Sequence, residues 1–101
     1  MSVPFSASDP SILSNGTVVV DFYALWCGPC KRYAPEFEEL AKIFSKMTFV
    51  KVNTEEHESV QEKYEVSSLP TTLVLVNGKE KARFEGYNLQ DIKEMLMAFV
   101  D

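Results

Sequence analysis

Three segments of the chain are almost wholly apolar and rich in β-branched residues, a pattern typical of buried strands. They are "TVVVDFYA" at 17–24, "TFVKVN" at 48–53 and "TTLVLV" at 71–76. A shorter strand is expected at 3–5. Asn77-Gly78 favours a type I′ turn, so the third segment should form a β-hairpin with "KEKARFEG" at 79–86. The pattern therefore predicts five strands, of which the last two are antiparallel.

Between the strands at 17–24 and 48–53 the apolar period changes to three or four residues, as on one face of a helix. This helix is expected from Pro29 to about Lys46. Its apolar stripe consists of Tyr33, Phe37, Leu40, Phe44 and Met47. Pro35 lies inside the stripe, and because the stripe continues beyond it, Pro35 should kink the helix without ending it.

Three shorter helices are expected elsewhere. One covers 8–14 and ends at the turn signal Asn15-Gly16. A second opens at Asn53, which forms a capping-box pattern with Glu56 three residues on. The third starts near Asn88, and its inner stripe consists of Leu89, Ile92, Leu96 and Phe99. The chain is therefore expected to form about four helices in all.

The resulting order of elements is βαβαβαββα, which indicates an α/β fold. Strands that alternate with helices pair in parallel through right-handed crossovers and carry helices on both faces, whereas the closing hairpin must be antiparallel. We expect a central mixed sheet of about five strands with about four helices on its two faces. Chemistry in such sheets gathers at the carboxyl ends of the parallel strands. Cys27 follows the strand at 17–24 and opens the longest helix, so this end of the sheet is the expected site.

Length and charge narrow the possible functions. The 101 residues suit one domain, spanning 1–101. A formal net charge of −5 disfavours binding to nucleic acid or to an anionic membrane surface, since both need clustered Lys and Arg. The first ten residues lack the basic and apolar regions of a signal peptide, and no apolar run approaches the ~20 residues of a membrane span. We therefore expect a cytoplasmic protein.

Both cysteines lie within "WCGPC" at 26–30, three positions apart. A structural disulfide across so short a loop would remove little entropy from the unfolded chain, which disfavours a stabilising staple. A structural zinc or other soft-metal site would need about four ligands. Beyond carboxylates the chain adds only His57, which is expected on the solvated face of a helix. No metal site is expected, and a reversible redox pair is the favoured interpretation.

Helical spacing suits the two sulfurs for that role. Residues three apart on a helix lie roughly 5 Å from one another, within the usual Cα separation of a disulfide. Cys27, at the helix N-terminus, faces free N–H groups that should lower its pKa, whereas Cys30 lies one turn deeper, is less exposed and should remain a thiol. Gly28 lets a partner chain approach, and Pro29 presets the first helical φ. The pattern predicts thiol–disulfide exchange, with Cys27 attacking and Cys30 resolving the mixed disulfide.

Two charges interrupt apolar strands, and these strands should be neighbours. Burial should raise the pKa of Asp21, and a nearby Lys51 ammonium should partly offset the rise. A carboxyl poised near neutrality beneath the cysteines could take the proton of Cys30 during resolution, directly or through a water. We hypothesise that Asp21 is this general acid/base. The alternative is that both charges point to solvent at the strand ends.

A family resemblance extends over nearly the whole chain. Its motifs are "DFYALWCGPCK" at 21–31, Pro35, "LPT" at 69–71, "NG" at 77–78 and Gly86. With these residues the chain resembles the thioredoxins, and Asp21 and Lys51 match the buried acid and nearby lysine of that family. The resemblance implies a thioredoxin fold and a protein-disulfide reductase active in electron transport and cell redox homeostasis. It implies that no cofactor is bound and that electrons come from NADPH through thioredoxin reductase. It also implies disulfide-containing substrates, such as peroxiredoxin-type proteins, and a monomeric protein.

The resemblance also suggests how substrate is held. The implied contact residues are Trp26, Gly28, Pro29, Leu69, Pro70 and Gly86. Trp26 would form part of the substrate surface, although packing in the core is the alternative for a tryptophan. Pro70 matches a cis-proline opposite the cysteines, and Leu69 before it would offer its backbone N–H and C=O to a substrate strand.

Three positions depart from the family pattern. Glu85 and Tyr87 flank Gly86 where smaller or apolar residues are usual, and Thr54 stands where an apolar groove residue is common. These changes leave the cysteine chemistry intact and bear on the choice of partner. A second function class also stays open, that of a thioredoxin-like binding or scaffold module without turnover.

Overall fold

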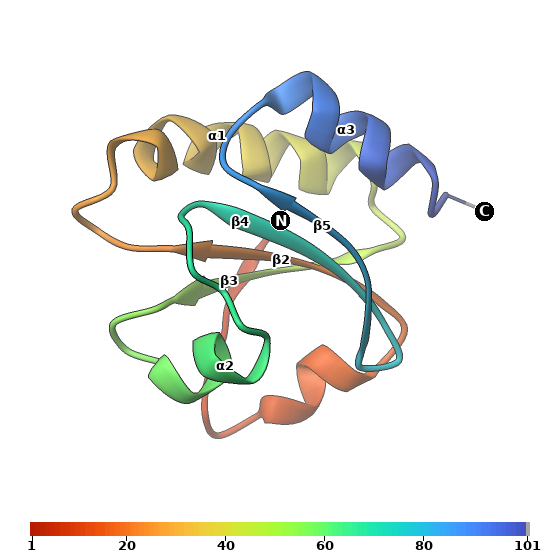
Figure 1. Cartoon of the computed structure of the whole chain (residues 1–101). Helices are drawn as coiled ribbons and strands as arrows, with labels where there is room; N and C mark the ends of the chain where they lie inside the picture. Colours follow the sequence, from red (N-terminus) through yellow and green to blue (C-terminus); the bar gives the residue numbers. More distant parts are fainter. Residues whose placement is uncertain (101) are drawn as a thin grey trace.

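The computed structural model describes residues 1–100 as a five-stranded sheet with helices on both of its faces (Figure 1). Along the chain the elements are β1 (Val3–Pro4), η1 (Pro10–Ser14), β2 (Thr17–Tyr23), α1 (Gly28–Ile43), β3 (Thr48–Asn53), α2 (Glu58–Lys63), β4 (Thr71–Val76), β5 (Lys79–Glu85) and α3 (Leu89–Met97). The predicted order of elements is confirmed.

The sheet has the strand order β1-β3-β2-β4-β5 and is mixed, as predicted. β3 pairs in parallel with both β1 and β2, whereas β4 is antiparallel to β2 and to β5. Asp21 is the direct register partner of Lys51 across the β2–β3 pair. The two charged positions therefore meet in the middle of the sheet.

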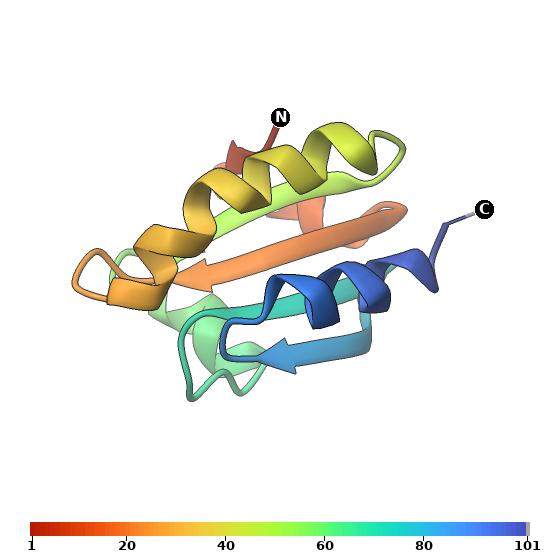
Figure 2. The same ribbon diagram turned by 90° about the horizontal axis from the view of Figure 1, so that it is seen from above.

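Side-chain alternation along β2 divides the core into two layers. Val19 contacts the layer beneath α1 and α3, which cover one face of the sheet (Figure 2). Val18, Val20 and Phe22 contact the other layer, to which η1 contributes Leu13 and the end of α2 contributes Tyr64. Because side chains alternate with a period of two, Asp21 points toward the same layer as Val19. That layer is the one beneath α1.

The helix count differs slightly from the prediction. About four helices were expected, whereas within residues 1–100 the structure has three α-helices, and the short helix expected at 8–14 is a 3-10 helix. The 3-10 helix is η1, which begins at Pro10 and has only five residues. Gly16, with a φ of +72°, turns the chain into β2 immediately afterwards. A segment so short favours the tighter 3-10 form.

Helix α1 passes through Pro35 without ending, as expected. It begins at Gly28 with Pro29 in its first turn, where a missing N–H costs nothing. It ends at Ile43, a few residues before the expected Lys46, and Phe44 occupies the C-cap. The buried stripe of the helix consists of Cys30, Tyr33, Phe37, Leu40 and Ala41.

Helix α2 begins later than the capping-box pattern predicts. The Asn53 side chain accepts a hydrogen bond from the N–H of Glu55 at 2.9 Å, so it closes a turn at the end of β3 instead of opening a helix. His57 occupies the N-cap of α2 without a side-chain cap bond. Its ring is half-buried edge-to-face against Phe5, with centroids 4.9 Å apart, so the expectation of a solvated helix face for His57 was wrong.

The β4–β5 hairpin turns at Asn77 and Gly78, as predicted. Their φ values are +51° and +85°, and a type I′ turn requires positive φ at both central residues. Among the helices of residues 1–100, none is both long enough and apolar enough to cross a membrane.

Asn88→Ala is expected to lower the free energy of unfolding by about 1 kcal/mol, the usual cost of losing a helix N-cap. The Asn88 side chain accepts a hydrogen bond from the N–H of Asp91 at 3.1 Å, at the start of α3. Urea denaturation measures the change. Asn88→Ser keeps a capping oxygen and should recover most of the loss, whereas an equal loss in both variants would contradict the capping role.

Candidate active site

The two cysteines lie where β2 gives way to α1, at the carboxyl end of the β2 and β3 strands. Cys27 is the N-cap of α1, and it forms a disulfide with Cys30, one turn inside the helix. Their Cα atoms are 5.2 Å apart, in agreement with the spacing that the sequence predicts. The N–H of Cys30 donates a hydrogen bond to Sγ of Cys27 at 3.2 Å. The same N–H would stabilise a thiolate on Cys27.

The exposure of the two sulfurs differs less than expected. Cys27 is 5% exposed and Cys30 is 3% exposed, so both are buried in this disulfide form. They pack in a small cluster with Ala24, against which Tyr23 and Leu69 also lie. These neighbours cover Cys27, and exposure alone therefore does not distinguish the attacking sulfur from the resolving one.

Trp26 is the exposed residue beside the disulfide. Its exposed fraction is 70%, and that of Leu25 is 67%, which excludes the alternative that Trp26 fills the core. A hollow of about 370 Å³ lies next to Trp26. Its lining residues are Trp26, Thr54, Glu55, Glu58, Gln61, Ser67 and Leu69. Apolar and acidic groups thus share one hollow at the edge of the redox site.

The segment between α2 and β4 brings a second wall to the disulfide. The Leu69–Pro70 peptide bond is cis, as the resemblance implies. Leu69 packs against the cluster that holds the two cysteines. The carbonyl of Pro70 accepts a hydrogen bond from the N–H of Gly86 at 2.8 Å, and Gly86 has a φ of +94°, which favours glycine. Leu69, Pro70 and Gly86 therefore form one side of the site.

Asp21 is buried beneath the cysteines, at 2% exposure. Burial is the main cause that raises its pKa to about 7, Lys51 acts to lower it, and Glu38 acts to raise it. Its Oδ1 makes no hydrogen bond within the described residues. The predicted burial and the predicted opposition of Lys51 are both confirmed, and the alternative that Asp21 points to solvent is wrong.

Lys51 lies partly exposed at the side of the site. Its Nζ is 3.7 Å from Oε2 of Glu38, and within residues 1–100 this is the ion pair that Lys51 forms. Glu38 is a residue that the sequence did not reveal, because no spacing along the chain connects α1 with β3. Only the packing of the helix over the sheet brings Glu38 to Lys51.

A cavity of about 180 Å³ has both Cys30 and the buried Asp21 in its lining. It is lined by Asp21, Tyr23, Ala24, Leu25, Cys30, Lys31, Ala34 and Lys51. The cavity is roomy enough for water and offers polar groups to hold it. Cys30 and Asp21 therefore lie on the walls of one cavity.

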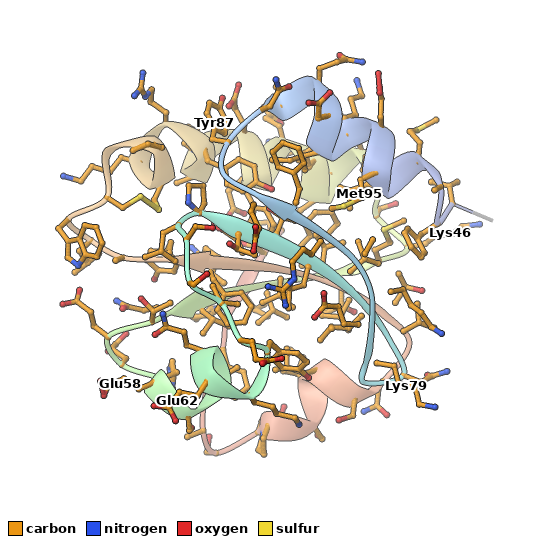
Figure 3. The ribbon with its side chains drawn as sticks, viewed as in Figure 1. Lys46, Glu58, Glu62, Lys79, Tyr87 and Met95 are labelled. Carbon is orange, nitrogen blue, oxygen red and sulfur yellow. A yellow bond between two sulfur atoms is a disulfide. The ribbon has the colours of Figure 1, made fainter. Side chains whose placement is uncertain are left out.

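The three unusual positions of the sequence have partners inside the chain. The hydroxyl of Thr54 donates to the carbonyl of Tyr23 at 3.2 Å, which satisfies a polar group at a buried position. Tyr87 lies beside α1 (Figure 3). Its hydroxyl donates a hydrogen bond to Glu36. Oε2 of Glu85 lies 3.5 Å from Nη1 of Arg83, with which it forms an ion pair. Within residues 1–100, no group of three or more His, Cys, Asp or Glu side chains is arranged to hold a metal ion.

Comparison with known proteins agrees with this site. The family model for thioredoxin matches residues 6–99. Thioredoxin 1 of Plasmodium falciparum is 43% identical over 88 residues, covering 87% of this chain and 85% of that protein. Thioredoxin-1 of Saccharomyces cerevisiae is 43% identical over 93 residues, covering 92% and 90%. The solution structure of oxidised Plasmodium falciparum thioredoxin matches with a TM-score of 0.90 at 40% identity, covering 100% of this chain and 99% of that one. With its redox cysteine pair, the chain belongs to the thioredoxin family of protein thiol–disulfide oxidoreductases.

Proposed function

We propose that this oxidoreductase works in the reducing direction on disulfides of other proteins, with electrons that reach it from NADPH through thioredoxin reductase. The observation that carries the proposal is the cysteine pair at the start of α1 with a buried acid across one cavity. A proline between the cysteines, Pro29, accords with a reductant. No bound cofactor is needed, because the two sulfurs store the electron pair themselves.

In the first step the Cys27 thiolate attacks one sulfur of the substrate disulfide. A bond forms between Cys27 and that sulfur, the substrate bond breaks, and the second substrate sulfur leaves as a thiolate that takes up a proton. The N–H of Cys30, aimed at Sγ of Cys27, stabilises the attacking anion. The product of this step is a mixed disulfide.

In the second step Cys30 resolves the mixed disulfide. Asp21 accepts the proton of Cys30 through the cavity between them, and the resulting thiolate attacks Sγ of Cys27. The Cys27–Cys30 bond forms and the remaining substrate thiolate leaves. The substrate has then gained two electrons and the protein has lost two. Lys51 opposes the rise in the pKa of Asp21 and so helps to set the pH range in which this carboxyl can accept a proton.

The substrate is held on the surface around the disulfide. Trp26 offers an exposed apolar face on one side. Gly28 and Pro29 are exposed beside Cys27, and a Cβ atom added at Gly28 would meet nothing within 4 Å, which leaves room for a substrate chain. On the other side the N–H and C=O of Leu69 make no hydrogen bond to other described residues, which leaves them to pair with a substrate strand. Pro70 and Gly86 keep this wall in place.

The partners proposed for the protein are thioredoxin reductase and disulfide-containing proteins of the peroxiredoxin type. A similar solved structure, with a TM-score of 0.86 at 25% identity, concerns the thiol resolving mechanism of a yeast mitochondrial 1-Cys peroxiredoxin via glutathione/thioredoxin systems. That likeness supports the choice of partner class. We further propose that the protein is a cytoplasmic monomer of one domain, with its acidic net charge of −5 disfavouring nucleic acid and membrane surfaces.

Reduction of insulin tests the function. In the presence of dithiothreitol the protein is expected to accelerate precipitation of the freed insulin chains, and with NADPH and thioredoxin reductase it should oxidise NADPH in proportion to insulin disulfides. A protein without cysteines, Cys27→Ser/Cys30→Ser, is the control. Acceleration no greater than with that control would contradict the proposal and favour the binding or scaffold module.

A further inference from the structure

The carboxylate of Glu38 lies among the charged groups around Asp21, although no step of the proposed reaction uses it. Its Oε2 is 3.7 Å from Nζ of Lys51. Glu38 also accepts hydrogen bonds from Ser2, from its N–H at 3.0 Å and from its hydroxyl. Three segments, the residue before β1, the helix α1 and the strand β3, therefore meet at this carboxylate.

Lys51 lies between two carboxyl groups. Asp21 is its register partner in the sheet, and both line the cavity below Cys30. Within residues 1–100, however, Lys51 forms its ion pair with Glu38, whereas Oδ1 of Asp21 has no hydrogen-bond partner. An ammonium stabilises a carboxylate more strongly the closer it lies. The direction in which Lys51 is held therefore affects Asp21.

We propose that Glu38 is a positioning residue for Asp21, because it holds the Lys51 ammonium toward α1 and so keeps Asp21 able to take up a proton. The inference rests on the proposed role of Asp21 as the proton acceptor for Cys30. Withdrawal of Lys51 and the negative charge of Glu38 act in the same direction, since both disfavour the ionised form of Asp21. The opposite effects of Lys51 and Glu38 on the pKa of Asp21 agree with this arrangement.

Other titratable groups also face Asp21. They are Tyr23 on β2 and Cys30, Lys31 and Tyr33 on α1, while its β4 partner Thr72 is uncharged. Burial raises the pKa of both tyrosines above its usual value, so they stay neutral where Asp21 titrates. In the oxidised protein the disulfide removes the thiol of Cys30. Lys31 is present in every variant below, so differences between variants report on Glu38 and Lys51.

The titration of Asp21 in the oxidised protein tests the inference. Its carboxyl carbon can be followed by NMR from pH 4 to pH 9. Glu38→Gln is expected to lower the midpoint by about half to one pH unit. Glu39→Gln removes the same charge one residue away, where the side chain is exposed and pairs with Lys42 at 3.4 Å, and should leave the midpoint unchanged. Equal midpoints for the wild type and Glu38→Gln would overturn the proposal.

The same titration in a Lys51→Met background asks whether Glu38 acts through Lys51. Lys51→Met alone should raise the midpoint, because it removes the cation that lowers the pKa of Asp21. Adding Glu38→Gln to it should then shift the midpoint by less than half of what Glu38→Gln does alone. An undiminished shift would mean that Glu38 acts only by its own charge, and would overturn its proposed hold on Lys51.

Kinetics separate this inference from the proposed function. The resolving step can be started from a mixed disulfide preformed on Cys27, and its rate measured against pH. A rate profile that moves to lower pH in Glu38→Gln together with the NMR midpoint supports both proposals. A lowered midpoint with an unmoved rate profile supports the positioning of Asp21 by Glu38 and contradicts the role of Asp21 as the base.

Discussion

Cys27→Ser is expected to reduce disulfide-reductase activity roughly a thousandfold or more, the scale of losing a catalytic nucleophile. A serine hydroxyl at the start of α1 is not ionised near neutral pH, so nothing attacks the substrate disulfide. Cys30→Ser should instead complete the first attack and stop there. It is therefore expected to accumulate a covalent adduct with substrate, one for each protein molecule. Mass spectrometry of the unreduced mixture measures the adduct.

The two variants control one another. Each lacks the Cys27–Cys30 disulfide and carries one serine, so any cost of losing the bond to the fold is common to both. Only the position of the remaining sulfur differs. Adducts on Cys30 in Cys27→Ser as abundant as those on Cys27 in Cys30→Ser would contradict the assignment of nucleophile and resolving thiol. Adducts trapped from a cell extract by Cys30→Ser would also identify substrates.

The difference between the two sulfurs arises from the helix terminus more than from exposure. At 5% and 3% exposure the cysteines are almost equally covered. The N–H of Cys30 nevertheless points at Sγ of Cys27, at 3.2 Å, and Cys27 caps the helix. Unpaired N–H groups and the helix dipole favour an anion at that position alone. Cys27 should therefore ionise first even though it is buried.

Much of the fold could be predicted because local pattern and tertiary packing agree. The apolar segment at 17–24 forms β2, the helical stripe at 29–46 forms most of α1, and Asn77-Gly78 forms the hairpin turn. The site followed from the same pattern, since Cys27 and Cys30 lie at the junction of a parallel strand and a helix. Asp21 was predictable as a lone acid within an apolar strand.

What could not be predicted depends on contacts between distant segments. Asn53 and Glu56 have the spacing of a capping box, yet Asn53 is the last residue of β3 and its side chain closes the turn that follows. His57 is half-buried because Phe5 lies against it, 52 positions earlier in the chain, a contact that only the folded sheet creates. Glu38 belongs to the same class, because its partners Ser2 and Lys51 lie in other elements.

Asp21→Asn is expected to make the oxidised protein more stable than the wild type above pH 7, by about 4 kcal/mol. Asp21 is 2% exposed, and burial raises its pKa to about 7, whereas the same group in the unfolded chain has a pKa of about 3.9. Below about pH 4 the carboxyl is protonated in both states and contributes nothing to the pH dependence. Between about pH 4 and pH 7 the folded state binds more protons than the unfolded state, so the free energy of unfolding falls as pH rises. A shift of about three pH units corresponds to about 4 kcal/mol, and above pH 7 the loss is complete.

Urea denaturation of both proteins at several pH values between 4 and 8 measures this effect. The difference in the free energy of unfolding should be small at pH 4, grow up to pH 7 and then level off. Glu80, whose pKa is lowered by Arg83, is present in both proteins, is not among the groups that shift Asp21, and cancels in the difference. A difference that stays constant with pH would show that Asp21 titrates alike in the folded and unfolded states. If Asp21→Asn also slows the resolving step, the buried carboxyl destabilises the folded protein but is retained as the proton acceptor beneath Cys30.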